Sequence, residues 1–393
     1  MKRAVITLGE PIVISQADPS VKDWGAWQFP SLSLMADGGL HLSYHTHSDS
    51  AAAYGRENPH MVSYDNGESW RHVDVLPSPD GTLLPNGDRL RLKTLRSVKA
   101  GELLLPKPVA EANHVTQQFK YYHAGDIPHK YCGYPIERFK KGGCEWIIEK
   151  HYPEIPGEMR CVVHDDTKNY PAGDSTEYLP LPMIFDTLKV APDGKIWATT
   201  YLCLDLNDGN VISHVVFLIS DDNGKTFKYH SRILYNPDHS RDVLSVKREG
   251  FTEPDINFMP DGSVICIMRT QDSNGNGPSY IARSTDGGFT WSKPRIFDDL
   301  GVWPQLVQLG NGVTLLSYGR PGFFLRATVD PAGLEWGERI QILEPGHGTC
   351  SYSGLVAIDD NSAFVTYSDF AYPNGEGIPV KTILGRHVTI RPE

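Results

Sequence analysis

The chain has 393 residues, of which 40% are apolar, and this is enough to build a large hydrophobic core. Its formal net charge of −11 argues against a surface for nucleic acid or anionic membrane, because either partner would repel it over most approaches. The 37 glycines and 29 prolines favour many short strands over long helices, although the length alone would also allow two domains.

The N-terminal stretch MKRAVITLGEPIVIS has two basic residues and then a short apolar run that ends at Gly9. Such a run is too short for the hydrophobic segment of a secretion signal and far too short to span a bilayer. We therefore expect a soluble, cytoplasmic chain without a membrane partner. The six cysteines are scattered without a Cys-x-x-Cys pair, so neither a disulfide framework nor a zinc site is expected.

An octet with the pattern Ser-x-Asp-x-Gly-x-x-Trp recurs along the chain. It reads SYDNGESW at 63–70, STDGGFTW at 284–291 and, with Phe in place of Trp, SDDNGKTF at 220–227; weaker copies occur at 139–146 and 328–336. The aspartate can accept hydrogen bonds from nearby backbone amides, and the glycine can adopt the positive φ of a tight turn. Each octet is therefore expected to join two antiparallel strands and to serve structure rather than function.

A second turn signal marks six hairpins, each between two apolar runs. Its copies are ADGG (36–39), KAGE (99–102), PDGK (192–195), PDGS (260–263), GNGV (310–313) and DDNS (359–362). A hairpin followed by an octet hairpin makes four strands, so the six units predict an all-β fold, a six-bladed β-propeller with one domain over 1–393. The N-terminal run is expected to complete the last blade, and 109–182 to be an irregular, loop-rich insertion.

Polar groups are predicted to converge at one mouth of the central channel, because the first strand of each propeller blade lines that channel. The residues that enter the first strands are Gln28, Asp186, Glu253, Gln305 and Tyr352, with the second blade ambiguous among Arg91, Lys93 and Arg96. The residues that leave the second strands are His45, Lys107, Tyr201, Arg269 and Arg320. Their convergence predicts a ligand site at this mouth.

The octets resemble the Asp-box (BNR) turns of the sialidase, or neuraminidase, superfamily, and the resemblance covers essentially the whole chain. In EPDINFMPDGSVICIMR, Glu253 precedes Arg269 by 16 residues. This is similar to the segment where sialidases carry the glutamate that assists the nucleophile and one of three arginines that bind the substrate carboxylate. CSYSGLVAI resembles the segment with the tyrosine nucleophile, which implies that role for Tyr352. SYGRPG supplies Arg320 near the expected third arginine, with Arg326 as the alternative.

The chain also departs from the sialidase pattern. Gln28 stands where sialidases have their first arginine, and Arg56 is the candidate to replace that arginine in space. The acid/base is expected in THSDSAAAYGRENPH, where Asp49 is the first choice and Glu57 the other carboxylate. The expected substrate-binding set is completed by His45, His47 and Asp186. A His-Asp-His metal site in HTHSD lacks further ligand spacing, so no metal and no cofactor are expected.

These residues predict a retaining exo-glycoside hydrolase that removes a terminal acidic or polar sugar from a glycan through Tyr352, a carbohydrate being its only expected partner. A glutamate can take the proton of a tyrosine that is a weak nucleophile near neutral pH. With Gln28 in place of one arginine, we expect little activity on sialosides and a preference for another carboxylated sugar held by Arg269 and Arg320. The alternatives are a polysaccharide lyase acting next to a uronic acid, with Tyr352 or His45 as base, and a carbohydrate-binding propeller without catalysis.

Overall fold

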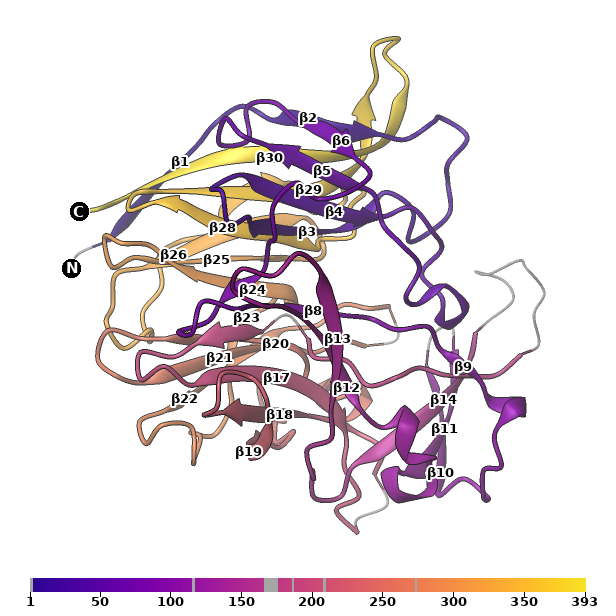
Figure 1. Ribbon diagram of the computed structural model, residues 1–393. Helices are drawn as coiled ribbons and strands as arrows, with labels where there is room; N and C mark the ends of the chain where they lie inside the picture. Colours follow the sequence, from indigo (N-terminus) through magenta and orange to yellow (C-terminus); the bar gives the residue numbers. More distant parts are fainter. Residues whose placement is uncertain (1–2, 115–116, 166–175, 186, 208–209, 273) are drawn as a thin grey trace.

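The computed structural model describes residues 3–114, 117–165, 176–185, 187–207, 210–272 and 274–393. Within these ranges the regular secondary structure consists of β-strands and short 3-10 helices (Figure 1). The 3-10 helices are η1 (Ala51–Ala53), η2 (Ala100–Glu102), η3 (Ala124–Asp126), η4 (His129–Tyr131) and η5 (Ser245–Lys247). In this part of the chain no helix has the length and apolar character needed to cross a membrane.

Six antiparallel sheets follow one another along the chain and form the blades of a β-propeller, which confirms the predicted fold class. The first contains β3 (Gln28–Leu34), β4 (Leu40–His45), β5 (His60–Ser63) and β6 (Arg71–Val73), and the second β7 (Thr82–Leu83), β8 (Arg89–Leu92), β12 (Tyr134–Phe139) and β13 (Trp146–His151). The third contains β16 (Leu188–Val190), β17 (Ile196–Cys203), β18 (Ser213–Ser220) and β19 (Lys228–Ile233). The fourth contains β20 (Thr252–Phe258), β21 (Val264–Arg269), β22 (Ser279–Ser284) and β23 (Arg295–Asp298), and the fifth β24 (Val302–Gln308), β25 (Thr314–Gly319), β26 (Phe323–Thr328) and β27 (Ile340–Leu343).

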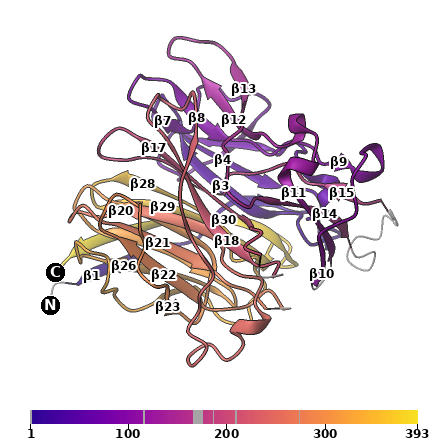
Figure 2. The same cartoon turned by 90° about the horizontal axis from the view of Figure 1, so that it is seen from below.

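The sixth blade is built from both ends of the chain. Its C-terminal strands are β28 (Ser353–Asp359), β29 (Ser362–Pro373) and β30 (Pro379–Pro392). Both β1 (Ala4–Leu8) and β2 (Ile12–Gln16) pair antiparallel with β30. The N-terminal run therefore completes the last blade as predicted, and the two ends of the chain lie close together in both views (Figures 1 and 2).

The hydrophobic core lies in layers between neighbouring blades. Between the second and third blades, Leu90 and Ile136 of one sheet pack with Ile196 and Val216 of the other, and all four side chains are fully buried. Similar clusters fill the spaces between the third and fourth, the fourth and fifth, the fifth and sixth, and the sixth and first blades. Burying the faces of the sheets in this way removes apolar surface from water.

Polar bonds tie the first strands of three blades together around the channel. Asp255 on β20, only 2% exposed, accepts hydrogen bonds from Thr187 Oγ1 before the third blade (2.8 Å) and from Leu306 N of the fifth (2.7 Å). Lys189 Nζ lies 2.8 Å from the same carboxylate and also donates to two backbone carbonyls. A site built at the ends of these strands is therefore held on a rigid frame.

The octet turns join the third and fourth strands of their blades, as predicted. Ser63 Oγ donates to Asp65 Oδ1 (2.7 Å) and accepts from Gly67 N (2.8 Å), and Gly67 has a φ of 99°. The same pair of bonds recurs in the octets at 220–227 and 284–291. The polar atoms of these turns are thus bonded to one another, which supports their structural role.

The prediction for the inner hairpin of the second blade is wrong. That hairpin is β7–β8, closed by the turn at 84–88 in which Gly87 has a φ of 89°, whereas 99–102 covers the end of β9 (Val98–Lys99) and η2, outside the blade. The Asn-Gly pair at 86–87 was a valid turn signal. The hairpin is easily overlooked in the sequence, because β7 has only two residues and is too short to show the alternation of a strand.

The stretch 109–182 is not mainly irregular. Besides β12 and β13 it supplies most of an additional sheet, ordered β10-β11-β14-β15-β9. Its strands are β9 (Val98–Lys99), β10 (Ala110–His114), β11 (Gln117–His123), β14 (Met159–Asp165) and β15 (Tyr178–Leu179). This sheet lies beside the propeller, with β14 against β17 and β15 against η1 (Figures 1 and 2).

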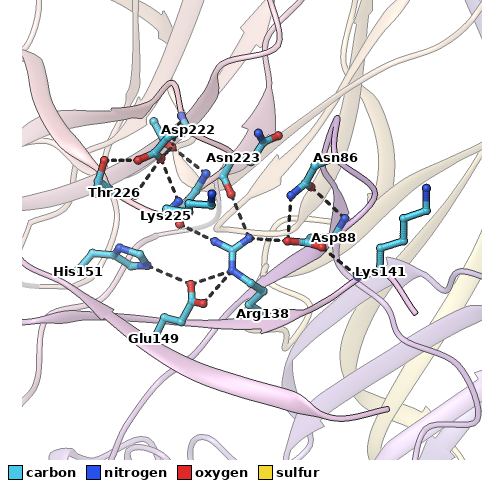
Figure 3. A network of polar contacts seen from close by, with 12 residues as sticks. Asn86, Asp88, Arg138, Lys141, Glu149, His151, Asp222, Asn223, Lys225 and Thr226 are labelled. Carbon is cyan, nitrogen blue, oxygen red and sulfur yellow. Dashed lines mark hydrogen bonds and ion pairs between the residues drawn. The ribbon is translucent and has the colours of Figure 1, made fainter. Parts of the chain in front are cut away.

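Arg138 on β12 joins the second blade to the octet turn of the third (Figure 3). Its Nε donates to Glu149 (2.9 Å) and its Nη1 to Asp88 (3.1 Å). The same guanidinium donates to the carbonyls of Asn223 (3.0 Å) and Gly224 (2.7 Å). Since the side chain is only 3% exposed, these charge-assisted bonds are shielded from water.

We expect Arg138→Ala to lower the free energy of unfolding by about 2–3 kcal/mol, because it leaves two partly buried carboxylates and two backbone carbonyls without their donor. Urea denaturation followed by tryptophan fluorescence measures the change. Arg241→Ala is the control, because Arg241 is exposed and its loss is expected to change stability by less than about 0.5 kcal/mol. A loss below about 1 kcal/mol for Arg138→Ala would show that this clamp is dispensable.

Candidate active site

Four predicted residues meet at one end of the blades, where first strands begin and second strands end. Glu253 is the second residue of β20, and Tyr352 directly precedes β28. Arg269 ends β21, and Arg320 follows β25. The arrangement brings blades four, five and six together at one mouth of the channel.

The first strands of three blades begin with the same bulge. The register against the second strand shifts between Gln28 and Ser31, between Thr252 and Asp255, and between Val302 and Gln305. Each bulge holds a residue with positive φ, namely Phe29 (55°), Glu253 (45°) and Trp303 (52°). Such a conformation costs a non-glycine residue of order 1–3 kcal/mol and is concentrated at functional sites. All three side chains contact Tyr352.

Tyr352, Glu253 and Arg269 form a hydrogen-bonded triad. The phenol of Tyr352 donates a short hydrogen bond to Glu253 Oε1. Arg269 Nη1 donates both to Glu253 Oε1 (2.6 Å) and to the phenol oxygen (3.2 Å). The second carboxylate oxygen accepts from Trp303 N (3.1 Å). Glu253 is therefore held as a hydrogen-bond acceptor directly behind the tyrosine hydroxyl.

The pKa of Tyr352 is raised well above its usual range, first by burial and then by the negative charge of Glu253. The phenol is therefore neutral at physiological pH and can act as a nucleophile only if a base removes its proton in the same step. Glu253 is in position to be that base.

Arg269 has few donors left for a ligand. Its Nη2 donates to Gln271 Oε1 and to the carbonyl of Gly275 (3.0 Å), while Gln271 in turn donates to Glu249. With Nη1 bonded to Glu253 and the phenol, both ends of the guanidinium are engaged within the protein. Its Nε is buried and makes no hydrogen bond within the described residues.

Arg320 is the second guanidinium at the site. Its Nη2 donates to the carbonyl of Cys350 (2.6 Å), and its Cζ lies 5.6 Å from the ring centre of Trp24 and 5.8 Å from that of Tyr352. Burial and then the neighbouring charge of Arg269 lower the pKa of Arg320. The two arginines therefore repel one another, and an anion or an aromatic face beside them relieves that repulsion.

Aromatic rings surround the tyrosine on the side of the first and fifth blades. The ring centre of Phe29 lies 4.7 Å from that of Tyr352, and the ring centre of Trp303 lies 4.5 Å from it. Trp24 lies edge-on to Phe29 at 6.3 Å and is 39% exposed. An exposed indole at a channel mouth is a usual surface for sugar rings, which offer apolar faces to it.

Gln28 does not face the ligand site. It is fully buried, and its side-chain oxygen accepts from Gly25 N (3.1 Å) and Lys381 Nζ (3.2 Å). Its predicted equivalence with Glu253 is wrong by one residue: the two blades share the same bulge, in which the structural counterpart of Glu253 is Phe29. A substrate-binding role for Gln28 is therefore unsupported.

His45 lies opposite Gln28 at the end of β4, and its ring packs edge-on against Phe29 at 5.0 Å. Burial, and then the nearby His47, lower the pKa of His45 to about 4. The imidazole is therefore neutral near pH 7. It can accept a proton or a hydrogen bond there, and it is unsuited to serve as the acid.

His45 is expected to make the fold sensitive to mild acid. The pKa of His45 in the folded protein lies below its ordinary value in the unfolded chain. The imidazole therefore contributes to the free energy of unfolding above about pH 6.5, and this contribution is lost as the pH falls towards 4. We expect the loss to be about 2 kcal/mol after solvent screening. His45→Gln should flatten this part of the curve of unfolding free energy against pH, measured by urea denaturation. The exposed His72→Gln should leave the curve unchanged, and an unchanged curve for His45→Gln would refute the assignment.

The remaining predicted residues lie farther from the triad or outside the described ranges. Asp49 Oδ2 accepts from Trp24 Nε1 (3.2 Å), so its carboxylate lies next to the exposed indole. His47 Nε2 donates to the carbonyl of Glu57 (3.2 Å). Arg56 follows η1 and is exposed, and within the described part of the chain it has no bond to the triad. The predicted residue Asp186 lies outside the described residues.

Four residues of the site were not predicted from the sequence: Phe29, Trp303, Gln271 and Trp24. A signal for two of them exists, because each bulge residue is followed by proline at 30, 254 and 304. Aligning the blades on these prolines matches Phe29 and Trp303 with Glu253, and the hairpin turns agree, because all three residues lie nine positions before the turn glycine (Gly38, Gly262 and Gly312). Proline restricts the residue before it, which makes this alignment physically sensible.

The described residues contain no group of three or more His, Cys, Asp or Glu side chains placed to hold a metal ion. The mouth presents a phenol, carboxylates, an imidazole and guanidinium groups.

Comparison with known proteins places the fold. No protein-family model and no curated protein matches the sequence. Among solved structures, a protein of unknown function from Dyadobacter fermentans is similar over 98% of this chain and 99% of its own, with 21% identity and a TM-score of 0.61. An α-L-arabinanase from Penicillium chrysogenum, complexed with arabinobiose, is similar over 96% and 98%, with 12% identity and a TM-score of 0.53.

The NanB sialidase from Streptococcus pneumoniae is similar over 96% of this chain and 70% of its own, with 14% identity and a TM-score of 0.52. The chain therefore has the fold of the propeller glycosidases, a class that includes both sialidases and arabinanases. At such low sequence identities, the similarity to these structures concerns the fold and does not extend to the reaction.

Proposed function

We propose that the protein is a retaining exo-glycoside hydrolase in which Tyr352 is the nucleophile and Glu253 the base that takes its proton. The observation that carries this proposal is the bond from the Tyr352 hydroxyl to Glu253, with Arg269 donating to the same phenol oxygen. A tyrosine, a carboxylate and a cation in this order form an activated nucleophile.

In the first step the Tyr352 oxygen attacks the anomeric carbon and the glycosidic bond breaks. The phenol proton passes to Glu253, and an acid protonates the departing oxygen. Arg269 stabilises the negative charge that develops on the phenol oxygen, which lies 3.2 Å from its Nη1. The product of this step is a sugar linked to Tyr352 by an ether bond.

In the second step water attacks the same carbon from the other side, Tyr352 departs and recovers its proton from Glu253, and the acid of the first step takes the proton from the water. Two displacements at one carbon retain its configuration. Asp49 is the candidate for the acid/base, because its carboxylate is fixed beside the mouth by Trp24.

The two alternative functions are less well supported. A lyase would need both arginines to neutralise a substrate carboxylate, but Arg269 has both ends bonded within the protein. A purely binding propeller would not need Tyr352 within hydrogen-bond reach of a buried carboxylate, and here the two are bonded.

Proton NMR of the reaction with an activated aryl glycoside tests the proposal. We expect the first-formed free sugar to have the anomeric configuration of the substrate, before mutarotation mixes the two forms. An inverted first product would contradict the tyrosine intermediate, and an unsaturated product absorbing in the near ultraviolet would indicate the lyase.

A further inference from the structure

Resting on the proposed function, we infer that the sugar bound at the mouth is uncharged, a neutral pentose or hexose unit held by aromatic faces rather than by an arginine clamp. This differs from the carboxylated sugar that the sequence alone suggested. The difference follows from the contacts of three groups: Arg269, the first-blade bulge residue Phe29, and Trp24.

A carboxylate clamp needs guanidinium groups whose paired donors face the ligand. Arg269 uses Nη1 for Glu253 and the phenol, and Nη2 for Gln271 and Gly275. Arg320 has Nη2 on a backbone carbonyl. The Nε of each arginine is buried without an acceptor, and Nη1 of Arg320 has no protein acceptor within the described residues. Neither arginine therefore has both Nη groups free for the fork that a carboxylate clamp needs.

The first blade adds no cation to replace the missing arginine. Its counterpart of Glu253 is Phe29, whose ring lies against Tyr352. Lys381, which bonds Gln28 next to it, is only 8% exposed and donates to the carbonyls of Asp23 and Ala26. The wall that would recognise a carboxylate is therefore apolar.

Trp24 gives this wall an exposed ring for a sugar. It is 39% exposed, although it lies edge-on to both Phe29 (6.3 Å) and Phe370 (6.1 Å) and its Nε1 is anchored on Asp49. A rigid, exposed indole suits the C–H face of a neutral sugar, and Arg320 beside it can bond a hydroxyl.

An uncharged sugar is also compatible with a tyrosine nucleophile. Glu253 is 6% exposed and accepts bonds on both oxygens, whereas Tyr352 is the more exposed of the two. The phenol is thus the group that meets the ligand, whatever the charge of the sugar.

A panel of 4-nitrophenyl glycosides tests the inference, with neutral pentosides and hexosides, uronides and a sialoside at equal concentration. We expect the best neutral glycoside to exceed the uronides and the sialoside in kcat/KM by at least about 100-fold. A uronide or sialoside as the best substrate would overturn it. The same set titrated into Tyr352→Phe by tryptophan fluorescence gives affinity without turnover, and binding of the neutral sugar should not change with sodium chloride.

Two variants of Trp24 separate stacking from the anchoring of Asp49. Trp24→Ala should raise KM for the neutral glycoside by about 10-fold, whereas Trp24→Phe, which keeps a ring but loses the bond to Asp49, should keep KM and lower kcat. Phe289→Ala is the control, because Phe289 is also exposed but lies in the octet turn at 284–291. An unchanged KM in Trp24→Ala would overturn the inference.

These outcomes are distinct from failure of the proposed function. Full activity of Tyr352→Phe on a neutral glycoside would reject the nucleophile but keep the sugar class. Turnover of an acidic sugar that is lost in Tyr352→Phe would keep the nucleophile and reject the sugar class. Neither turnover nor binding of any member of the panel would reject both.

Discussion

Tyr352→Phe is expected to lower kcat/KM by at least about 10³-fold, because it removes the nucleophilic oxygen and leaves the ring in place. The melting temperature should change little, since Glu253 keeps its bonds to Arg269 and Trp303 N. Steady-state kinetics on the best aryl glycoside, together with thermal unfolding, measures both effects.

Tyr44→Phe is the matched control for this prediction. Tyr44 is a buried tyrosine of the first blade whose hydroxyl bonds Ser15 at 2.6 Å, and it makes no bond to the triad within the described residues. Its activity should stay within about twofold of the parent protein. Equal activities of Tyr352→Phe and Tyr44→Phe would exclude Tyr352 as the nucleophile.

Asp49→Asn is expected to have an effect that depends on the leaving group. For an alkyl glycoside, whose departing oxygen needs a proton, kcat/KM should fall by about 10²–10⁴-fold, while for a dinitrophenyl glycoside it should fall by less than about 10-fold. The reason is that a dinitrophenolate departs without protonation. Kinetics on a series of leaving groups of known pKa measures the dependence.

Glu57→Gln is the control for Asp49→Asn, since Glu57 is the other carboxylate of the same loop and is exposed. It should leave the whole series unchanged. If Asp49→Asn reduced the rate equally for all leaving groups, Asp49 would have a binding or structural role, and the acid would have to be sought among the other carboxylates at the mouth.

The blade architecture could be predicted because it depends on local chemistry. A turn such as 63–70 needs only its own serine, aspartate and glycine, and these residues make the expected bonds to one another. The Tyr352, Glu253 and Arg269 contact was also foreseeable, since the ends of neighbouring strands in a propeller converge at one mouth. Their closeness therefore agrees with the sequence-based prediction.

The mouth residues of the first strands could have been predicted from the turn positions, because Phe29, Glu253 and Trp303 each lie nine residues before the turn glycine of their hairpin (Gly38, Gly262 and Gly312). The prediction instead placed Gln28 and Gln305 there, one residue before and two residues after the positions that the structure uses. The additional sheet was missed for a different reason. Its short strands β9 and β15 pair across some 80 intervening residues, so neither shows its partner locally.

The bonding state of Arg269 was likewise invisible in the sequence. Its partners Gln271 and Gly275 lie close to it along the chain, but only the folded loop directs their oxygen atoms to Nη2. This contact changes the expected ligand, because an arginine whose donors are engaged within the protein cannot form a fork with a carboxylate.

Covalent trapping with an activated 2-deoxy-2-fluoro glycoside, followed by peptide mass mapping, tests the role of Tyr352 most directly. The fluorine slows the second step, so the labelled intermediate should accumulate on the peptide that contains Tyr352, as an ether that resists hydroxylamine. A label on Glu253 or another carboxylate would be an ester, which hydroxylamine releases. Such a label would contradict the tyrosine mechanism.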